Sequence, residues 1–254
     1  MHYQEYLPDP GLTRIVRCFW VSSGRQDGLS RILPDGCMDF IFNFGSPIIS
    51  SSASRTYRNT FTAFIVGNMT TPTLSRAERN NELLGIRFNP AGLYTLLKMP
   101  LCQFTDDVVD LENFKPFGQW MDQLADHPDT DRRLKCLNQL LLSQINSPPN
   151  FPAVDIALRT IYRSRGQVRI AALEEVARLS RRQLERQFMT VVGVSPKQVA
   201  RIAQFEHMLG LLRSRGEESL LQLAIDGGYN DHAHFTKSFK EFAGVTPQEF
   251  VTKR

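Results

Sequence analysis

Eight side chains near the C-terminus have the types and the spacing needed to read DNA base pairs. They form two groups fifty-one positions apart: Arg181, Arg182, Glu185 and Arg186, then His232, Ala233, Thr236 and Lys237. Arginine can donate two hydrogen bonds to guanine O6 and N7, glutamate can accept one from cytosine N4, and methyl groups can contact the methyl of thymine. The chemistry that these residues offer is therefore recognition of base edges and phosphates.

A repeated pattern predicts that each group lies on a helix with a buried stripe. The pattern spans residues 180–196 and again 231–247, and each copy begins with an N-cap residue and ends in Gly, an apolar residue, Ser or Thr, and Pro. Apolar residues recur every four positions in both copies, which directs one side of each helix to a core. The expected inward residues are Leu184 and Phe188 in the first copy and Phe235 and Phe239 in the second.

Three arginines lie near the start of the first helix, where their positive charge is electrostatically unfavourable. The helix macrodipole already makes that end positive, so their presence favours a phosphate or base edge as the intended partner. Two roles for Glu185 stay open. It can accept a hydrogen bond from cytosine, or it can hold Arg181 or Arg182 in position.

The segment Asp231-His232-Ala233-His234 has a competing interpretation as a metal site. Ligands at positions i and i+2 do not share a helix face, and no second group of ligands accompanies them. We therefore expect neither a metal nor another cofactor, and no catalytic residue is assigned.

A helix expected over residues 196–213 joins the two copies and spans roughly 25 Å. Successive major-groove segments on one face of DNA lie about 34 Å apart, so this helix can hold two helix-turn-helix units apart. Each unit needs a preceding helix, expected over 171–178 and 219–226. The second unit turns through a Gly-Gly pair, whereas the first turns at Arg178-Leu179 without glycine.

These motifs resemble the AraC/XylS family of bacterial transcriptional regulators over about residues 153–254. The resemblance rests on Leu179-Ser180-x-Arg182-x-Leu184-x-Arg186-x-Phe188, on Gly193-x-Ser195-Pro196, and on Gly227-Gly228-Tyr229-Asn230-Asp231 through Gly244-Val245-Thr246-Pro247. It implies two helix-turn-helix units whose DNA-facing positions are Arg182, Glu185, Arg186, His232, Ala233, Thr236 and Lys237. Arg178 departs from the family, in which many members have glycine.

Residues 1–146 predict a β-rich domain followed by helices. Short runs rich in aromatic and β-branched residues, separated by turn-forming clusters, favour a sandwich or small barrel; the runs are 15–21, 38–44, 61–66 and 83–88. Helices are expected over 89–97, with proline at the first helical position, over 117–126 and over 132–145. The apolar stripe of the last one serves either core packing or pairing between subunits.

The N-terminal part is similar to the corresponding domain of a subgroup of AraC-like proteins. The similar stretches are Leu33-Pro34-Asp35-Gly36-x2-Asp39-Phe40-Ile41-Phe42-Asn43 and Gly85-Ile86-Arg87-Phe88-x-Pro90-x-Gly92. The resemblance implies a cupin-like barrel or sandwich that regulates or dimerises. For the Pro34-Asp35-Gly36 segment, a plain hairpin turn and a ligand-site loop stay open.

The expected organisation is therefore α+β: a β-rich regulatory or dimerisation domain over 1–146, a proline-rich linker over 147–152, and an all-α DNA-binding domain over 153–254. Charge supports this division. Residues 1–152 contain 14 Lys and Arg against 15 Asp and Glu, whereas residues 153–254 contain 16 against 11. The net basicity thus accompanies the repeated motif.

Other classes of protein fit less well. A metal-independent or cysteine-based enzyme fused to a DNA-binding domain is the alternative, but no Walker A, dinucleotide or Gly-x-Ser-x-Gly motif occurs. A protein-binding module that never touches DNA is a third class. The four cysteines are scattered, and the chain lacks apolar runs of about 20 residues, so we expect reduced thiols in a cytoplasmic protein without membrane spans. Expected partners are promoter DNA, and in addition RNA polymerase, a small-molecule effector and a second copy of the chain.

Overall fold

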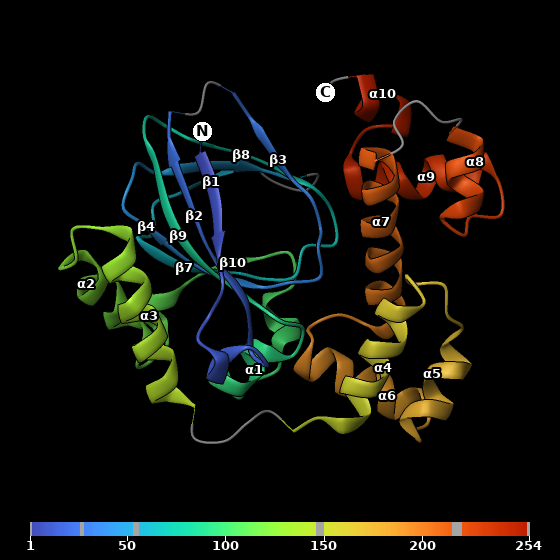
Figure 1. Cartoon of the computed structure of the whole chain (residues 1–254), viewed down its shortest axis with the longest axis horizontal. Coiled ribbons are helices and arrows are strands. Elements are labelled where there is room, and N and C mark those ends of the chain that lie inside the picture. The colour runs from blue at the N-terminus through green and yellow to red at the C-terminus, as the bar shows by residue number, and fades with distance from the viewer. Residues whose placement is uncertain (1, 26–27, 53–55, 146–149, 215–219, 253–254) are drawn as a thin grey trace.

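A β-rich half and a helical half lie side by side (Figure 1). The computed structural model describes residues 2–25, 28–52, 56–145, 150–214 and 220–252. The expected linker over 147–152 lies partly outside the described residues, and α4 begins at Pro152.

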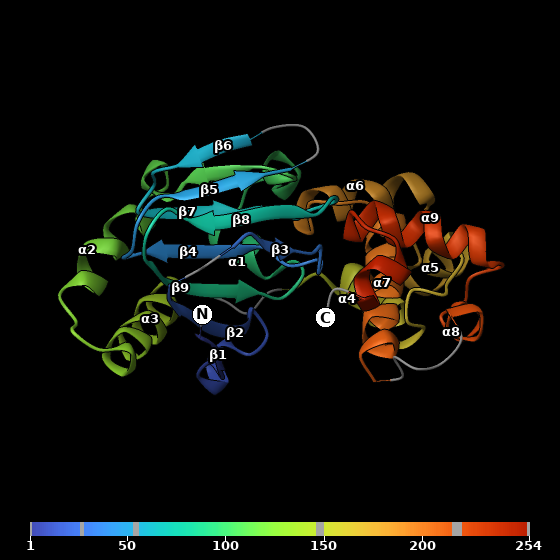
Figure 2. The ribbon, with the colours of Figure 1, turned by 90° about the horizontal axis from the view of Figure 1, so that it is seen from above.

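The strands form two sheets whose hydrogen-bonded neighbours are all antiparallel. The six-stranded sheet has the order β1 (His2–Tyr6), β2 (Val16–Gly24), β9 (Asn81–Phe88), β4 (Asp39–Asn43), β7 (Ala63–Val66) and β10 (Val108–Asp110). The four-stranded sheet has the order β3 (Ser30–Ile32), β8 (Thr73–Ala77), β5 (Ile48–Ser51) and β6 (Thr56–Asn59). The two sheets are seen from above in Figure 2.

Among the described residues, three α-helices belong to the β-rich half, of which α1 precedes β10, and seven form the C-terminal half. The first three are α1 (Gly92–Leu97), α2 (Trp120–Ala125) and α3 (Thr130–Gln144). The others are α4 (Pro152–Arg163), α5 (Ile170–Ala177), α6 (Arg181–Val191), α7 (Pro196–Ser214), α8 (Leu220–Asp226), α9 (His232–Ala243) and α10 (Pro247–Thr252). No helix within the described ranges combines the length and apolar character needed to cross a membrane.

Successive side chains of the six-stranded sheet point to opposite faces, and each face meets a different environment. In β4, Phe40 and Phe42 are fully buried in a core that also contains Trp120 of α2. The alternate residue Ile41 belongs to a smaller apolar cluster on the other face, with Trp20, Ile48 and Phe64. That second face looks toward the four-stranded sheet.

The apolar stripe of α3 lies in the core of the β-rich half. Leu134, Leu137 and Leu141 are buried there, and Ile145 packs against the same cluster. Of the two roles expected for this stripe, core packing is the one found. A dimer would therefore use another surface.

The helical half has two cores that share the long helix α7. One contains Leu184, Phe188 and the N-terminal part of α7, and the other contains Phe235, Phe239 and its C-terminal part. Every helix expected in this half is present, with described ends within about two residues of the expected ones. The short polar strands β3, β5, β6 and β8 were not expected.

Both helix-turn-helix units make the same turn with different residues. In the first, Arg178 has φ +52° and the Leu179 N–H donates to the Glu174 carbonyl at 3.1 Å. In the second, Gly228 has φ +75° and the Tyr229 N–H donates to the Ala224 carbonyl at 3.0 Å. The first unit thus makes the same turn without glycine, and Arg178 adopts the left-handed conformation there.

Arg178→Gly should stabilise the protein by about 1 kcal/mol, because a non-glycine residue in the left-handed region costs roughly that much. Urea unfolding of the full chain measures the change. The matched control is Arg159→Gly within α4, which should destabilise the protein by about 1 kcal/mol because that position is helical. Equal effects of the two substitutions would contradict the assigned turn.

Candidate DNA interface and ligand cavity

The first candidate helix, α6, buries one side and exposes the other. Its N-cap Ser180 and Gln183 form a capping box, which starts the helix at the expected residue. Leu184 and Phe188 are fully buried. Arg181, Arg182 and Arg186 are exposed.

Glu185 lies beside an arginine of the same helix. Its Oε1 accepts a hydrogen bond from Arg181 Nε at 3.2 Å, one helical turn away. Of the two roles left open for Glu185, this contact favours holding Arg181 in position. Arg182 and Arg186, four residues apart, share one exposed side of the helix.

The second candidate helix, α9, has the same division. Asp231 caps it by accepting from the His234 N–H at 2.7 Å, and Phe235 and Phe239 are fully buried. His232, Ala233 and Lys237 are exposed. Thr236 differs, because its Oγ1 is buried and has no hydrogen-bond partner among the described residues.

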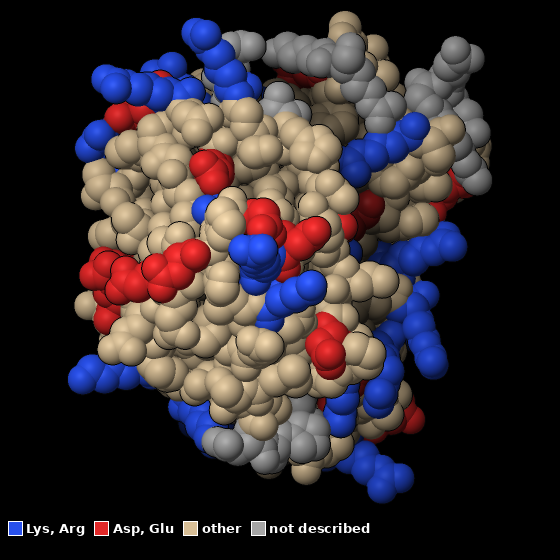
Figure 3. All heavy atoms as spheres, turned by 60° about the vertical axis from the view of Figure 1, so that its left-hand side comes forward, with Lys and Arg blue, Asp and Glu red and all other residues tan. Residues whose placement is uncertain are grey.

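Lysine and arginine side chains line the right-hand margin of Figure 3, whereas the front face carries both signs of charge.

His234, which the metal interpretation would pair with His232, instead packs edge-on against Tyr229 at 5.4 Å between ring centroids. Within the described parts of the chain, no three His, Cys, Asp or Glu side chains gather as metal ligands would.

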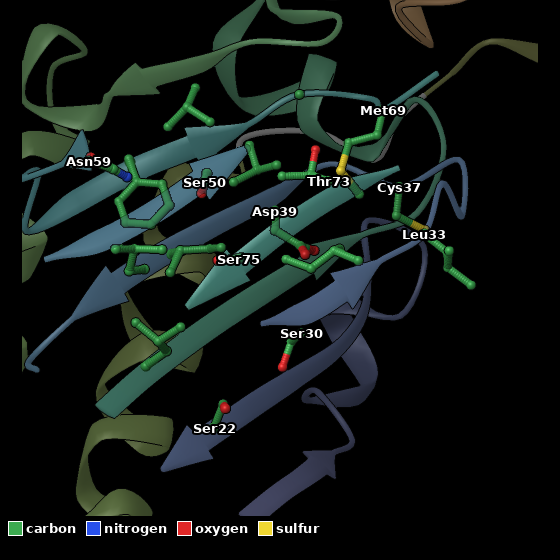
Figure 4. A pocket seen from close by; sticks show the side chains of 18 of the residues that line it. Ser22, Ser30, Leu33, Cys37, Asp39, Ser50, Asn59, Met69, Thr73 and Ser75 are labelled. Carbon is green, nitrogen blue, oxygen red and sulfur yellow. The ribbon is translucent and has the colours of Figure 1, made fainter. Parts of the chain in front are cut away.

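A cavity of about 490 Å³ lies between the two sheets, within the usual range for small-molecule sites. Its apolar wall includes Ile41, Ile48 and Phe64. Figure 4 shows Asp39, Ser50 and other polar side chains around the same space. No pattern in the sequence indicates this cavity, because its walls come from all ten strands of the described residues, and these strands are far apart in the chain.

A charged cluster closes one end of the cavity. The Arg87 guanidinium contacts Asp39 Oδ2 at 3.1 Å and Asp35 Oδ2 at 3.4 Å. Burial raises the pKa of Asp39 to about 6, although Arg87 opposes this rise. Asp35 thus lines the cavity, so the Pro34-Asp35-Gly36 segment is more than a plain hairpin turn.

The same segment touches the helical half. A Cβ added at Gly36 would lie 3.4 Å from the Tyr162 hydroxyl of α4 and 3.7 Å from Ile202 of α7. Arg17 Nη1 donates to Cys37 Sγ at 3.4 Å, and burial raises the pKa of the Cys37 thiol. A buried thiol with a raised pKa is a poor nucleophile. All four cysteines are free.

Glu206 of α7 faces this charged cluster. Its pKa is raised to about 7, first by burial and then by the Asp35 carboxylate, while Arg17 and Arg87 act in the opposite direction. Carboxylates of the two halves therefore repel each other once Glu206 ionises.

Donors from the β-rich half cap the C-terminal end of α6. Asn68 Nδ2 donates to the Val192 carbonyl at 2.5 Å, and Thr105 Oγ1 donates to the Gly193 carbonyl at 2.7 Å. The last carbonyls of a helix lack partners within the helix and carry partial negative charge. These two bonds therefore fix the end of α6 against the β-rich half.

The end of α9 is capped in the same way. Arg31 Nη1, from β3, donates to the Ala243 carbonyl at 2.8 Å. Leu33, two residues further along, lines the cavity and also packs against the core around Phe205 and Phe239. Both candidate helices thus end on the domain that contains the cavity.

Two family models match the chain. One, described as a helix-turn-helix domain, matches residues 173–253, and one described as a domain of unknown function (DUF6597) matches residues 4–110. An uncharacterized HTH-type transcriptional regulator of Haemophilus influenzae is 31% identical over 81 residues, which are 32% of this chain and 27% of that protein. The chain thus matches about a quarter of the length of this curated relative.

The whole fold is similar to that of ToxT from Vibrio cholerae. One ToxT structure aligns with a TM-score of 0.52 at 12% identity, covering 92% of this chain and 98% of ToxT. A second, of ToxT bound to (E)-4-(8-methylnaphthalen-1-yl)but-3-enoic acid, aligns with a TM-score of 0.50 at 13% identity over the same shares. Both alignments include the β-rich and the helical half.

Glu206→Gln should become more stable than the parent protein as the pH rises. Between pH about 4.5 and 7 the folded parent keeps a proton that the unfolded chain has released, so its stability falls through this window. The variant has no such loss, so at pH 8 it should be more stable than the parent protein by about 3 kcal/mol. Urea unfolding between pH 4.5 and 8 measures it.

The control has the opposite sign. Arg201 lowers the pKa of Glu241 through a 2.6 Å contact, so this pair stabilises the fold above the unfolded pKa and loses its effect as the pH falls. Glu241→Gln should therefore be less stable than the parent near neutral pH only. Parallel pH profiles for the two variants would contradict the assigned environment of Glu206.

Proposed function

We propose that the chain is a DNA-binding transcriptional regulator of the AraC family and that α6 and α9 are its two reading helices. Each enters a major-groove segment, and the two segments follow one another along the duplex. The observation that carries this proposal is that both helices bury their apolar stripes and expose two equivalent positions each, Arg182 and Arg186 on α6 and Ala233 and Lys237 on α9.

The roles of the residues on α6 follow from their exposure. Arg182 and Arg186 are free to reach base edges, and the fork of an arginine fits the two acceptors of guanine. Arg181 pairs with Glu185, so we assign it to a phosphate. Glu185 then positions Arg181 and does not read a base.

On α9, His232 and Lys237 are the donors, and the Ala233 methyl is available to a thymine. The Thr236 hydroxyl is buried in the structure, so it donates to DNA only after rotation of its side chain. The connecting helix α7 has 19 residues and spans roughly 28 Å, which is comparable to one turn of DNA.

We further propose that the cavity is an effector site that acts on α6 and α9 through their capped ends. Arg31 lies between two cavity-lining residues, Ser30 and Ile32, and Asn68 lies between Gly67 and Met69, which also line it. A ligand that shifts these segments therefore shifts the donors that hold both helices. That ToxT has been solved with an organic acid bound supports an organic ligand in this fold.

The family assignment favours a regulator over an enzyme fused to a DNA-binding domain. Contact with RNA polymerase and formation of a homodimer stay predictions. Sedimentation of the purified chain with and without promoter DNA would test the second of these.

Arg186→Ala should weaken binding to the preferred DNA site by about 1–3 kcal/mol and relax selectivity at one base pair. The site is first selected from a random-sequence library by the parent protein. Titration by mobility shift at several salt concentrations then gives the loss for each base substitution. Arg132→Ala, the same change on α3 of the β-rich half, is the control and should bind like the parent.

Two results would count against this role. An equal loss on all sequences would mean that Arg186 touches only the backbone of DNA. Parent binding that did not weaken with rising salt would argue against phosphate contacts altogether.

Arg31→Ala should lower affinity for the complete site by about three- to tenfold, because the reading helices lose part of their preorganisation. Affinity for DNA that contains only the segment read by α6 should stay unchanged, since one helix alone needs no fixed spacing. Arg132→Ala again serves as the matched control. Equal affinity for the complete site would show that the cap on α9 does not couple the two halves.

A further inference from the structure

The charge inside the cavity selects against anions. Four aspartates and a single arginine are the charged side chains among the described residues that line it. The arginine, Arg87, is already engaged by Asp39 and Asp35. An entering carboxylate would meet an excess of negative charge with no free cation to receive it.

An aromatic wall stands beside these carboxylates. Trp20 is 6% exposed, lines the cavity, and stacks with Tyr3 at 6.1 Å between ring centroids. Its indole Nε1 lies near the Asp39 carboxyl and opposes the rise in the pKa of that carboxyl.

A Cβ at position 85 would collide with the indole ring, at 2.0 Å from its nearest atom. Gly85 therefore lets the Trp20 ring lie close over the sheet. Aromatic faces next to carboxylates are the pattern by which proteins bind organic ammonium groups.

Hydroxyl groups occupy the facing sheet. Ser50 of β5, Ser75 and Thr73 of β8 and the buried Asn59 of β6 line the opposite wall. The cavity thus offers a negative end, an apolar middle and a polar side able to hydrogen-bond a ligand's own polar groups.

We propose that the cavity binds an organic cation, with its ammonium group against Asp39 and Asp35 and its apolar body between Trp20, Ile41 and Phe64. This proposal rests on the proposed function only in taking the cavity as the effector site. At pH 7.5 Asp39 is ionised, since its pKa is about 6, and so carries the charge that the ammonium needs.

The test compares three ligands that share one body and differ in charge: 4-phenylbutylammonium, 4-phenylbutan-1-ol and 4-phenylbutyrate. Calorimetry with the full-length parent protein at pH 7.5 measures each. The ammonium should bind at least tenfold more tightly than the alcohol, and the carboxylate should bind more weakly than both. Trp20 fluorescence in a Trp120→Phe background reports whether binding occurs in the cavity, since Trp120 lies in the other core.

Asp39→Asn should reduce the affinity for the ammonium to that for the alcohol and leave the alcohol unchanged. If this variant does not fold, the three-ligand comparison on the parent protein still decides. The proposal is overturned if the carboxylate or the alcohol binds as tightly as the ammonium, or if none of the three binds at 10 mM.

The two proposals fail separately. Binding to the selected DNA site is measured without ligand and depends on α6 and α9, whereas the calorimetry contains no DNA. Loss of ligand binding with intact DNA binding would remove the cation proposal alone. Loss of DNA binding with a normal ligand series would remove the reading-helix proposal alone.

Discussion

One face of the six-stranded sheet packs into a filled core and the other lines a cavity, and the rest of the molecule depends on this difference between the two faces. Because neighbouring residues of a strand point in opposite directions, Phe40 enters a filled core while Asp39 and Ile41 face the second sheet. The filled core supplies the apolar burial that stabilises the domain. The opposite face carries carboxylates, an arginine and hydroxyls. Burying such groups costs free energy unless they are paired or hydrated, and the cavity leaves room for both.

The cavity and the helical half meet through backbone carbonyls. Helix C-terminal ends attract donors because their last carbonyls are unpaired and partially negative. Asn68 and Thr105 meet this need at α6, and Arg31 meets it at α9. Since these donors sit on segments that also form the cavity wall, a change in the cavity has a short, covalently connected path to both helices.

The two helix-turn-helix units illustrate how tertiary packing overrides a local preference. Gly228 adopts its left-handed conformation without strain, whereas Arg178 adopts the same conformation at a cost. The surrounding contacts, with Leu173 and Leu184 in a shared core, hold the first turn in shape. The two turns therefore have nearly the same geometry although one has arginine and the other glycine at the left-handed position.

The sequence by itself determined the helices of the C-terminal half, the N-caps of α6 and α9, and the inward and outward sides of these two helices. Those features depend on residues three or four positions apart, so the pattern within one segment contains them. The sequence did not predict strands β3, β5, β6 and β8, because they are short and polar and one face of their sheet lines a cavity rather than a core. The repulsion between Asp35 and Glu206 and the cap of Arg31 on Ala243 involve residues more than 150 positions apart. Only the tertiary structure decided these, because no local periodicity encodes which distant surfaces meet.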